Sequence, residues 1–149
     1  MTWYAHVTVA TIVYKENKFL LVYEDADGEK VYNQPAGHLE PEETLIDAAI
    51  RETLEETRWQ VEPRAYLGIS HYTSPANGVT YMRNSFIANP IKEITDYPLD
   101  KDIIKPVWLT YDEILERKDQ LRSPIVLNDI QRFLDGESYP LDIIYTHGE

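Results

Sequence analysis

Three glutamates on one short stretch of the chain could hold a divalent cation. Glu52, Glu55 and Glu56 lie close together in the sequence, and at about 100° per residue a helix places them within one arc. Three carboxylates on one face repel each other at neutral pH unless water solvates them or a cation binds them. Oxygen-only ligands of this kind suit Mg²⁺ or Mn²⁺. A glutamate-rich helix face is more often solvated, so the cluster alone leaves both interpretations open.

A longer spacing pattern includes this cluster. Gly37 is followed after five intervening residues by Glu43, and after seven more by Arg51 and Glu52. The pattern resembles the Nudix box, G-x5-E-x7-R-E-U-x-E-E-x-G-U, in which U is an aliphatic residue. Six of the seven fixed positions match, namely Gly37, Glu43, Arg51, Glu52, Glu55 and Glu56. This spacing is far more specific than a lone glycine loop, and it favours the metal site over the solvated face.

The resemblance to the Nudix family implies a role for each box residue. It implies that Glu52, Glu55 and Glu56 bind Mg²⁺, or Mn²⁺ in its place, and that the backbone carbonyl of Ala36 completes one metal site. It further implies that water attacks a phosphorus atom of a diphosphate linkage, with a carboxylate as the general base. Glu52 and Glu55 are both candidates for that base.

Three further residues are expected to support the site. In the family, the glutamate at the position of Glu43 supports the metal site or contacts a metal through water, and the arginine at the position of Arg51 pairs with the acids of the box. Many members add an acid from the loop before the last core strand. Asp102 is our first candidate for this acid and Asp100 the second, and solvated loop acids are the alternative.

The resemblance extends beyond the box to the bacterial NudJ-type phosphatases. It rests on residues 33–40 (NQPAGHLE), 121–124 (LRSP) and 139–141 (YPL), and it covers nearly the whole chain. This subfamily implies release of inorganic phosphate from nucleoside di- and triphosphates with Mg²⁺. It also implies action on thiamine-type diphosphates.

Residues that contact the substrate are harder to recognise. Arg83 or Arg122 can clamp a phosphate because a planar guanidinium suits that task, although each is more often a surface or packing residue. Aromatic side chains can stack on a base, and Tyr4, Tyr23 and Tyr32 are candidates, although most aromatic residues belong to a core instead. The four histidines show no ligand spacing, and only His38 lies beside the loop of the box.

Composition limits the class of protein and its partners. The chain has 149 residues, a net charge of −12 and no cysteine, which predicts a single domain over residues 1–149, with the box at 37–59. The acidic charge argues against binding of a nucleic acid polymer but not of a small phosphorylated substrate. No apolar run reaches a membrane-spanning length and no signal peptide is evident, so we expect a cytoplasmic protein. Monomer and dimer both remain open.

Alternating apolar residues and turn signals predict the elements that must position these residues. Strands are expected at 6–14, 18–23, 30–33, 61–70, 79–88 and 105–110, and helices from 43 or 44 to 57, at 110–117 and at 123–134. This order indicates an α+β fold, and the Nudix resemblance implies an α/β/α sandwich around a mixed sheet with the box as loop–helix–loop. Residues 90–102 read as irregular.

Local chemistry also predicts the helix ends. Thr110 and Glu113 match a capping box, and Ser123 is the expected N-cap of the last helix. Arg58 stands where the Nudix box has glycine, and Thr53 and Trp59 stand at aliphatic positions. Because a left-handed arginine costs about 1 kcal/mol, we expect the helix end to be rebuilt there.

Two other classes of function compete with a hydrolase. A Nudix-fold module that binds a nucleotide or sugar-nucleotide without cleaving it should lack one or more acids of the box, whereas all of them are present here. An acidic scaffold without a ligand would require the whole spacing to be chance. No P-loop, G-x-S-x-G or HExxH motif points to another catalyst.

Overall fold

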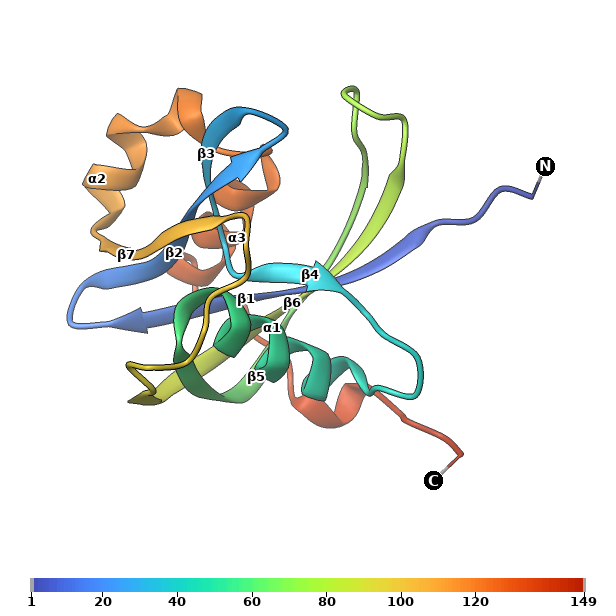
Figure 1. The fold of residues 1–149 in the computed structure, drawn as a ribbon. Coiled ribbons are helices and arrows are strands. Elements are labelled where there is room, and N and C mark those ends of the chain that lie inside the picture. The colour runs from blue at the N-terminus through green and yellow to red at the C-terminus, as the bar shows by residue number, and fades with distance from the viewer. Residues whose placement is uncertain (1, 149) are drawn as a thin grey trace.

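The computed structural model describes residues 2–148, which form seven strands, three α-helices and two short 3-10 helices (Figure 1). The strands are β1 (His6–Lys15), β2 (Lys18–Ala26), β3 (Glu29–Asn33), β4 (Ala36–His38), β5 (Trp59–Thr73), β6 (Thr80–Glu93) and β7 (Ile103–Leu109). The helices are α1 (Leu45–Thr57), α2 (Tyr111–Glu116), η1 (Lys118–Gln120), α3 (Ile125–Leu134) and η2 (Leu141–Ile143). Among residues 2–148, none of the helices combines the length and the apolar character that a membrane span requires.

The strands form one mixed sheet in the order β3-β2-β1-β6-β5, with β4 paired to β1 and β7 paired to β2. Among the named strands of residues 2–148, β1 and β6 run parallel and the other pairs are antiparallel. The β1–β2 hairpin turns through Glu16 and Asn17, whose positive φ angles of 51° and 68° match the right-handed twist of paired strands. The α+β class with a mixed sheet is confirmed.

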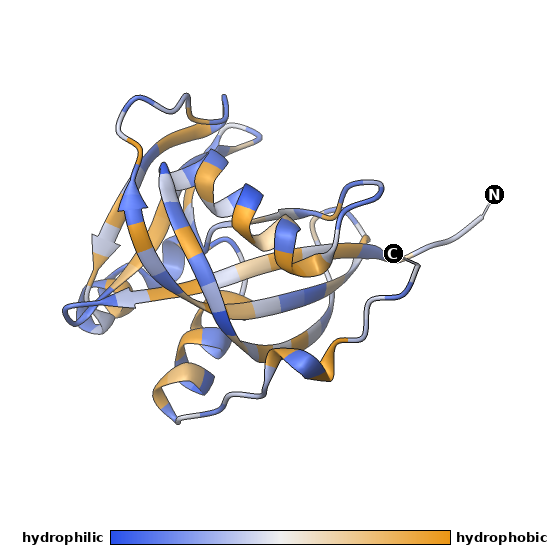
Figure 2. Cartoon of the chain, turned by 90° about the horizontal axis from the view of Figure 1, so that it is seen from below, coloured by the Kyte–Doolittle hydropathy of each residue, from blue (hydrophilic) through white to orange (hydrophobic). Residues whose placement is uncertain are grey.

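Side chains alternate between the two faces of β1, and each face packs against a different helix. Val9 of β1 packs with Ala48 and Ala49 of α1. Ile12, which points to the opposite face, packs with Val126 and Ile130 of α3. Helices therefore cover both faces, and the alternation of hydrophobic and hydrophilic residues along the strands is visible in Figure 2.

Several strand boundaries differ from the expectation. The predicted irregular segment 90–102 is wrong at its start, because β6 continues to Glu93 through pairing with β5. Strand β5 is longer than the expected 61–70 and runs from Trp59 to Thr73, and a register shift beside Pro63 accommodates the missing N–H. Residues 36–38, which lie outside the expected strands, form the short strand β4, which pairs with β1 and borders α1.

The helix ends confirm one prediction and correct two. Thr110 forms the predicted capping box with Glu113. Pro124, and not the predicted Ser123, is the N-cap of α3. The hydroxyl of Ser123 accepts a hydrogen bond from the N–H of Ile125. The end of α1 is not rebuilt, since Arg58 itself adopts φ 69°.

The left-handed conformation of Arg58 is held by contacts on both sides. Its N–H donates to the carbonyl of Leu54, and its carbonyl accepts from Ile94 at 2.7 Å. Its Nε donates to the carbonyl of Tyr97, also at 2.7 Å. These bonds to residues 94–97 offset the backbone strain and fix the segment that leads to Asp100.

Candidate active site

Helix α1 presents the acids of the box to the interior rather than to water. Thr44 caps the helix by accepting from the N–H of Asp47 at 3.0 Å. Glu52 and Glu56 are each only 8% exposed, whereas Glu55 is partly exposed. The simply solvated face considered above therefore does not describe Glu52 and Glu56. Carboxylates are rarely buried in this way unless a counter-charge or a metal accompanies them.

Strand β4 lies directly against these acids. The N–H of Ala36 donates to Oε1 of Glu56 at 3.0 Å. At Gly37, an added Cβ atom would lie 1.7 Å from Oε2 of Glu52, so only glycine leaves room for that carboxylate in its present position. The strand thus brings the backbone of residues 36 and 37 to the acids. This backbone includes the carbonyl of Ala36, which the family resemblance implies is a metal ligand.

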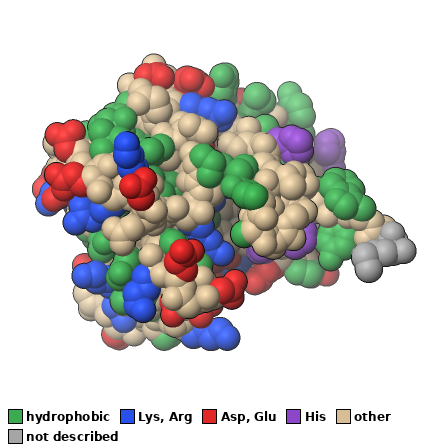
Figure 3. All heavy atoms as spheres, turned by 90° about the horizontal axis from the view of Figure 1, so that it is seen from above, with side chains coloured by type: hydrophobic (Ala, Val, Ile, Leu, Met, Phe, Trp, Pro, Cys, Tyr) green, Lys and Arg blue, Asp and Glu red, His purple; other side chains and the backbone are tan. Residues whose placement is uncertain are grey.

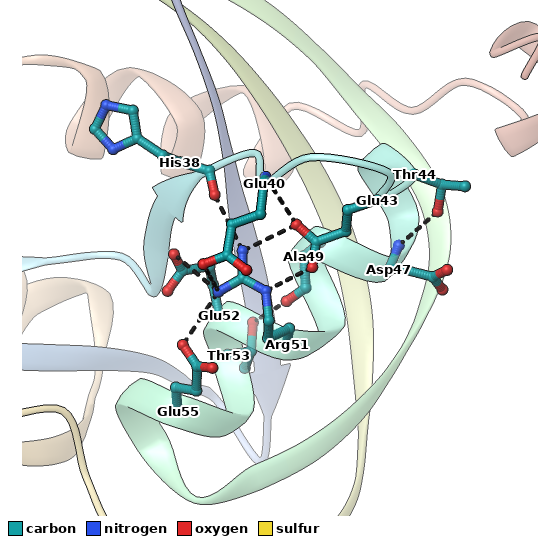
Figure 4. Close-up of polar contacts among 10 residues, drawn as sticks. All are labelled: His38, Glu40, Glu43, Thr44, Asp47, Ala49, Arg51, Glu52, Thr53 and Glu55. Carbon is teal, nitrogen blue, oxygen red and sulfur yellow. Dashed lines mark hydrogen bonds and ion pairs between the residues drawn. The ribbon is translucent and has the colours of Figure 1, made fainter.

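Arg51 joins the loop of the box to the helix (Figure 4). Its Nε and Nη2 form a two-point contact with Glu43 at 2.5 and 3.0 Å, and Nη2 also donates to the carbonyl of His38 at 3.0 Å. Its Nη1 lies 3.1 Å from Glu55 and 3.4 Å from Glu52. One guanidinium therefore fixes Glu43 and orients two of the predicted metal ligands.

The electrostatics of the cluster favour binding of a cation. Burial is the main cause that raises the pKa of Glu52, to about 7, and it also raises the pKa of Glu55 and, strongly, of Glu56. The hydrogen bond from Arg51 instead holds the pKa of Glu43 below its usual value. Arg51 alone does not neutralise the three acids, and a divalent cation is the partner that would.

The donor set fits Mg²⁺ or Mn²⁺. Carboxylate oxygens of Glu52, Glu55 and Asp100 all lie within 4.8 Å of one another, and oxygen-only sites suit these cations. Asp100 takes the position expected of the loop acid because its N–H donates to the carbonyl of Glu55 at 3.1 Å. Asp102, the first candidate, is not part of this group; its carbonyl accepts from the N–H of Asp25 on β2.

A cleft of about 1180 Å³ adjoins the cluster. One side of the cleft comes from the β2–β3 hairpin and the other from β4, β5 and β6. Glu56, Gly37 and Asp100 line it, so two acids of the site open onto a space that can hold a small organic ligand.

Both predicted arginines line this cleft, in different environments. Arg122 is paired through Nη1 with Glu24 at 2.8 Å. Arg83 is 8% exposed, and its Nη2 donates to the neutral amide oxygen of Gln34 at 2.6 Å, while its buried Nε has no partner among the described residues. Arg83 is therefore a buried cation without a direct carboxylate contact.

The aromatic candidates fall in different places. Tyr4 is 69% exposed and stacks on His6 outside the cleft. Tyr23 and Tyr32 pack against each other with ring centroids 4.7 Å apart, and neither lines the cleft. His38 does line it, and burial lowers the pKa of its imidazole.

Sequence reasoning missed a buried polar network behind Arg83. Oδ2 of Asp129 on α3 accepts from Gln34 at 3.1 Å and from the hydroxyl of Ser85 at 2.5 Å, and Gln34 in turn holds Arg83. Glu24, 5% exposed at the cleft, was also missed. No spacing in the chain relates these residues to the box, because strand pairing and the packing of α3 on the sheet bring them together.

Comparisons with known proteins agree with this geometry. The family model described as NUDIX domain matches residues 4–129. Phosphatase NudJ of Escherichia coli is 39% identical over 139 residues, which cover 93% of this chain and 90% of that protein, and the protein of the same name from Shigella flexneri gives the same values.

Solved structures show the same fold. A NUDIX hydrolase from Nitrosomonas europaea superposes with a TM-score of 0.95 and 39% identity, covering 97% of this chain and 98% of that one. The MutT protein from Methanosarcina mazei has a TM-score of 0.70 at 20% identity, covering 89% and 94%, and shows the fold alone. The chain therefore belongs to the Nudix family of hydrolases, enzymes that act on phosphoanhydride bonds.

Proposed function

We propose that this Nudix hydrolase requires Mg²⁺, which Mn²⁺ can replace, and releases inorganic phosphate from nucleoside di- and triphosphates and from thiamine-type diphosphates. The observation that carries the metal requirement is the convergence of Glu52, Glu55 and Asp100 at one point. Likeness to proteins named phosphatase supports release of phosphate. The nucleotide and thiamine-type substrates follow from the NudJ-type resemblance.

The ligands in this proposal are the carboxylates of Glu52, Glu55, Glu56 and Asp100 together with the carbonyl of Ala36. A divalent cation bound there would neutralise the phosphoryl oxygens and make a coordinated water easier to deprotonate. Either Glu52 or Glu55 accepts the proton from the attacking water. Arg51 keeps both glutamates in place, and Glu43 holds Arg51 through its two-point contact.

Arg83 is the stronger of the two candidates for a phosphate contact. Burial lowers the pKa of its guanidinium, and the negative charges of Asp129 and Glu56 oppose that effect. A phosphate oxygen in the cleft would supply the direct anionic partner that Arg83 lacks in the described chain. Arg122 already has such a partner in Glu24, so its contribution is expected to be smaller.

The test is phosphate release from GDP, GTP and thiamine diphosphate with Mg²⁺, by wild type and by Glu56→Gln. The amide can still accept the hydrogen bond from Ala36, so this change removes charge and conserves shape. The exposed Glu62→Gln is the matched control. We expect orthophosphate from several of these substrates, a loss of at least about 100-fold in Glu56→Gln, and wild-type rates in the control.

Other outcomes would revise specific parts of the proposal. Release of pyrophosphate would retain the hydrolase and reject the phosphatase specificity. Binding of nucleotides or sugar-nucleotides without turnover would favour the alternative of a non-hydrolytic binding module. Full activity after removal of divalent cations would reject the metal requirement.

A further inference from the structure

Two tyrosines stand side by side on the wall of the cleft. Tyr72 of β5 and Tyr81 of β6 are direct partners across the antiparallel pair, so their side chains leave the sheet on the same face. Both line the cleft, as does His38 of β4. The rings therefore open onto the same space as Glu56 and Gly37.

Tyr81 is held in place by several contacts, whereas Tyr72 makes fewer of them and is partly exposed. Tyr81 makes edge-type contacts with His6 and His38 at centroid distances of 5.7 and 6.2 Å, and its hydroxyl accepts from Asn77 at 3.0 Å. Within residues 2–148, Tyr72 makes no aromatic pair, although direct cross-strand partners have Cβ atoms only about 5 Å apart. Tyr72 is partly exposed and lines the cleft, so a ligand there can contact its ring.

The charges in the cleft are divided between its two sides. The side formed by the β2–β3 hairpin and residues 100–102 carries the acids Glu24, Asp25, Asp27, Glu29, Asp100 and Asp102. On the other side, the lining residues from 36–38 and 72–83 include no carboxylate, and their one cation is Arg83. Residues 36 and 37 lie against Glu56 and Glu52, so an uncharged ring is better accommodated beside the lining residues 72–83. In Figure 3, histidine side chains (purple) lie next to hydrophobic side chains (green, a class that includes tyrosine), toward the end of the molecule from which the N-terminal segment extends.

The position of Arg83 indicates how a substrate would be oriented along the two tyrosines. Arg83 and Tyr81 lie two residues apart on β6 and face the same side of the sheet, with Cα atoms about 7 Å apart. Phosphates between Glu56 and Arg83 would therefore place an attached ring beside Tyr81 and Tyr72. The cleft volume of about 1180 Å³ exceeds what a bare diphosphate would fill.

We propose that Tyr72, Tyr81 and His38 form a subsite for the planar heteroaromatic ring of the substrate. The subsite selects diphosphates attached to an aromatic heterocycle over inorganic pyrophosphate and aliphatic diphosphates. This inference rests on the proposed function, which it deepens by assigning the part of the substrate that does not react. Stacking on an aromatic side chain tolerates different rings, which suits a broad nucleotide preference.

The first test measures binding of guanosine, a neutral ring without phosphate, to the metal-free protein by saturation-transfer NMR. We expect transfer to the guanine protons in wild type and at least about fivefold weaker binding in Tyr72→Leu and Tyr81→Leu. Leucine keeps bulk in the strand, and Tyr81→Phe, which keeps the ring, should bind as wild type does. Tyr145→Ala, which removes a tyrosine that is 81% exposed and outside the cleft, is the control.

The second test separates the ring from the phosphate chemistry. With Mg²⁺, KM for GDP should rise about tenfold in Tyr72→Leu and Tyr81→Leu, while hydrolysis of the aliphatic isopentenyl diphosphate should keep its wild-type kcat/KM. Equal loss on both substrates, or no loss on GDP, overturns the subsite. Absence of hydrolysis in wild type would instead reject the proposed function. Guanosine binding would still test the subsite in that case, because a wild-type protein that does not bind guanosine overturns the subsite.

Discussion

Gly37 and Glu52 are in such close contact that no side chain fits between them. A Cβ atom at position 37 would lie 1.7 Å from Oε2 of Glu52 and 2.1 Å from its Cδ. The clash would fall on the end of a flexible side chain, so the glutamate can move away while the backbone stays. The glycine of the box therefore positions a carboxylate, in addition to shaping a loop.

Gly37→Ala should lower kcat/KM by at least about 100-fold, because it displaces a carboxylate that we assign to the metal site. Thermal unfolding should change little. Gly136→Ala is the opposite control, since Gly136 has φ 84° with open space around it and lies outside the cleft. That variant should lose about 1 kcal/mol of stability and keep its activity. Full activity in Gly37→Ala would show that the position of Glu52 does not matter.

Arg51→Lys should weaken Mg²⁺ binding although it conserves charge. An ammonium cannot reproduce the two-point contact with Glu43 together with the bonds to Glu55 and the carbonyl of His38. Loss of such orienting contacts costs about 10–100-fold in metal affinity or activity. Titration of activity with Mg²⁺ measures the change. Arg64→Lys, on the exposed side of β5, should titrate as wild type does.

Asp100→Asn and Asp102→Asn form a matched pair that tests the loop acid. Asp100 has a carboxylate oxygen within 4.8 Å of Glu52 and Glu55, and Asp102 is not part of that group. We expect Asp100→Asn to raise the Mg²⁺ concentration for half-maximal activity about tenfold, and Asp102→Asn to leave it unchanged. The reverse ranking would restore Asp102 as the loop acid.

The stability of the metal-free protein should fall between pH 5 and pH 8. Burial raises the pKa of Glu52 from 4.5 to about 7, so folding favours the protonated acid, and its contribution to stability is lost as pH rises through 7. Thermal unfolding of Glu52→Gln should show a smaller decrease over this range, and 1 kcal/mol corresponds to about 2–4 °C in a domain of this size.

Mg²⁺ should reverse this loss in wild type at pH 8, because a ligand that binds only the folded state stabilises it. Glu52→Gln should respond less, and the exposed Glu62→Gln should behave as wild type does. Identical pH profiles in wild type and Glu52→Gln would contradict the assignment of this titration to Glu52.

Local features of the sequence predicted the helix of the box and the face that carries its acids. Helical periodicity is a local property, so the spacing of Glu52, Glu55 and Glu56 sufficed to place them together. The capping box at Thr110 was predictable for the same reason. Arg58 was mispredicted because residues 94–97, distant in the chain, hold its strained backbone.

The rest of the site depends on which strands pair. Only the pairing of β4 with β1 brings Gly37 to Glu52, and only the contacts of the segment before β7 choose Asp100 over Asp102. The acids on the helix could thus be identified from the sequence alone. The burial that raises their pKa values, the loop acid beside them and the environment of Arg83 were decided by tertiary structure, because each depends on residues far apart in the chain that meet only when the sheet forms.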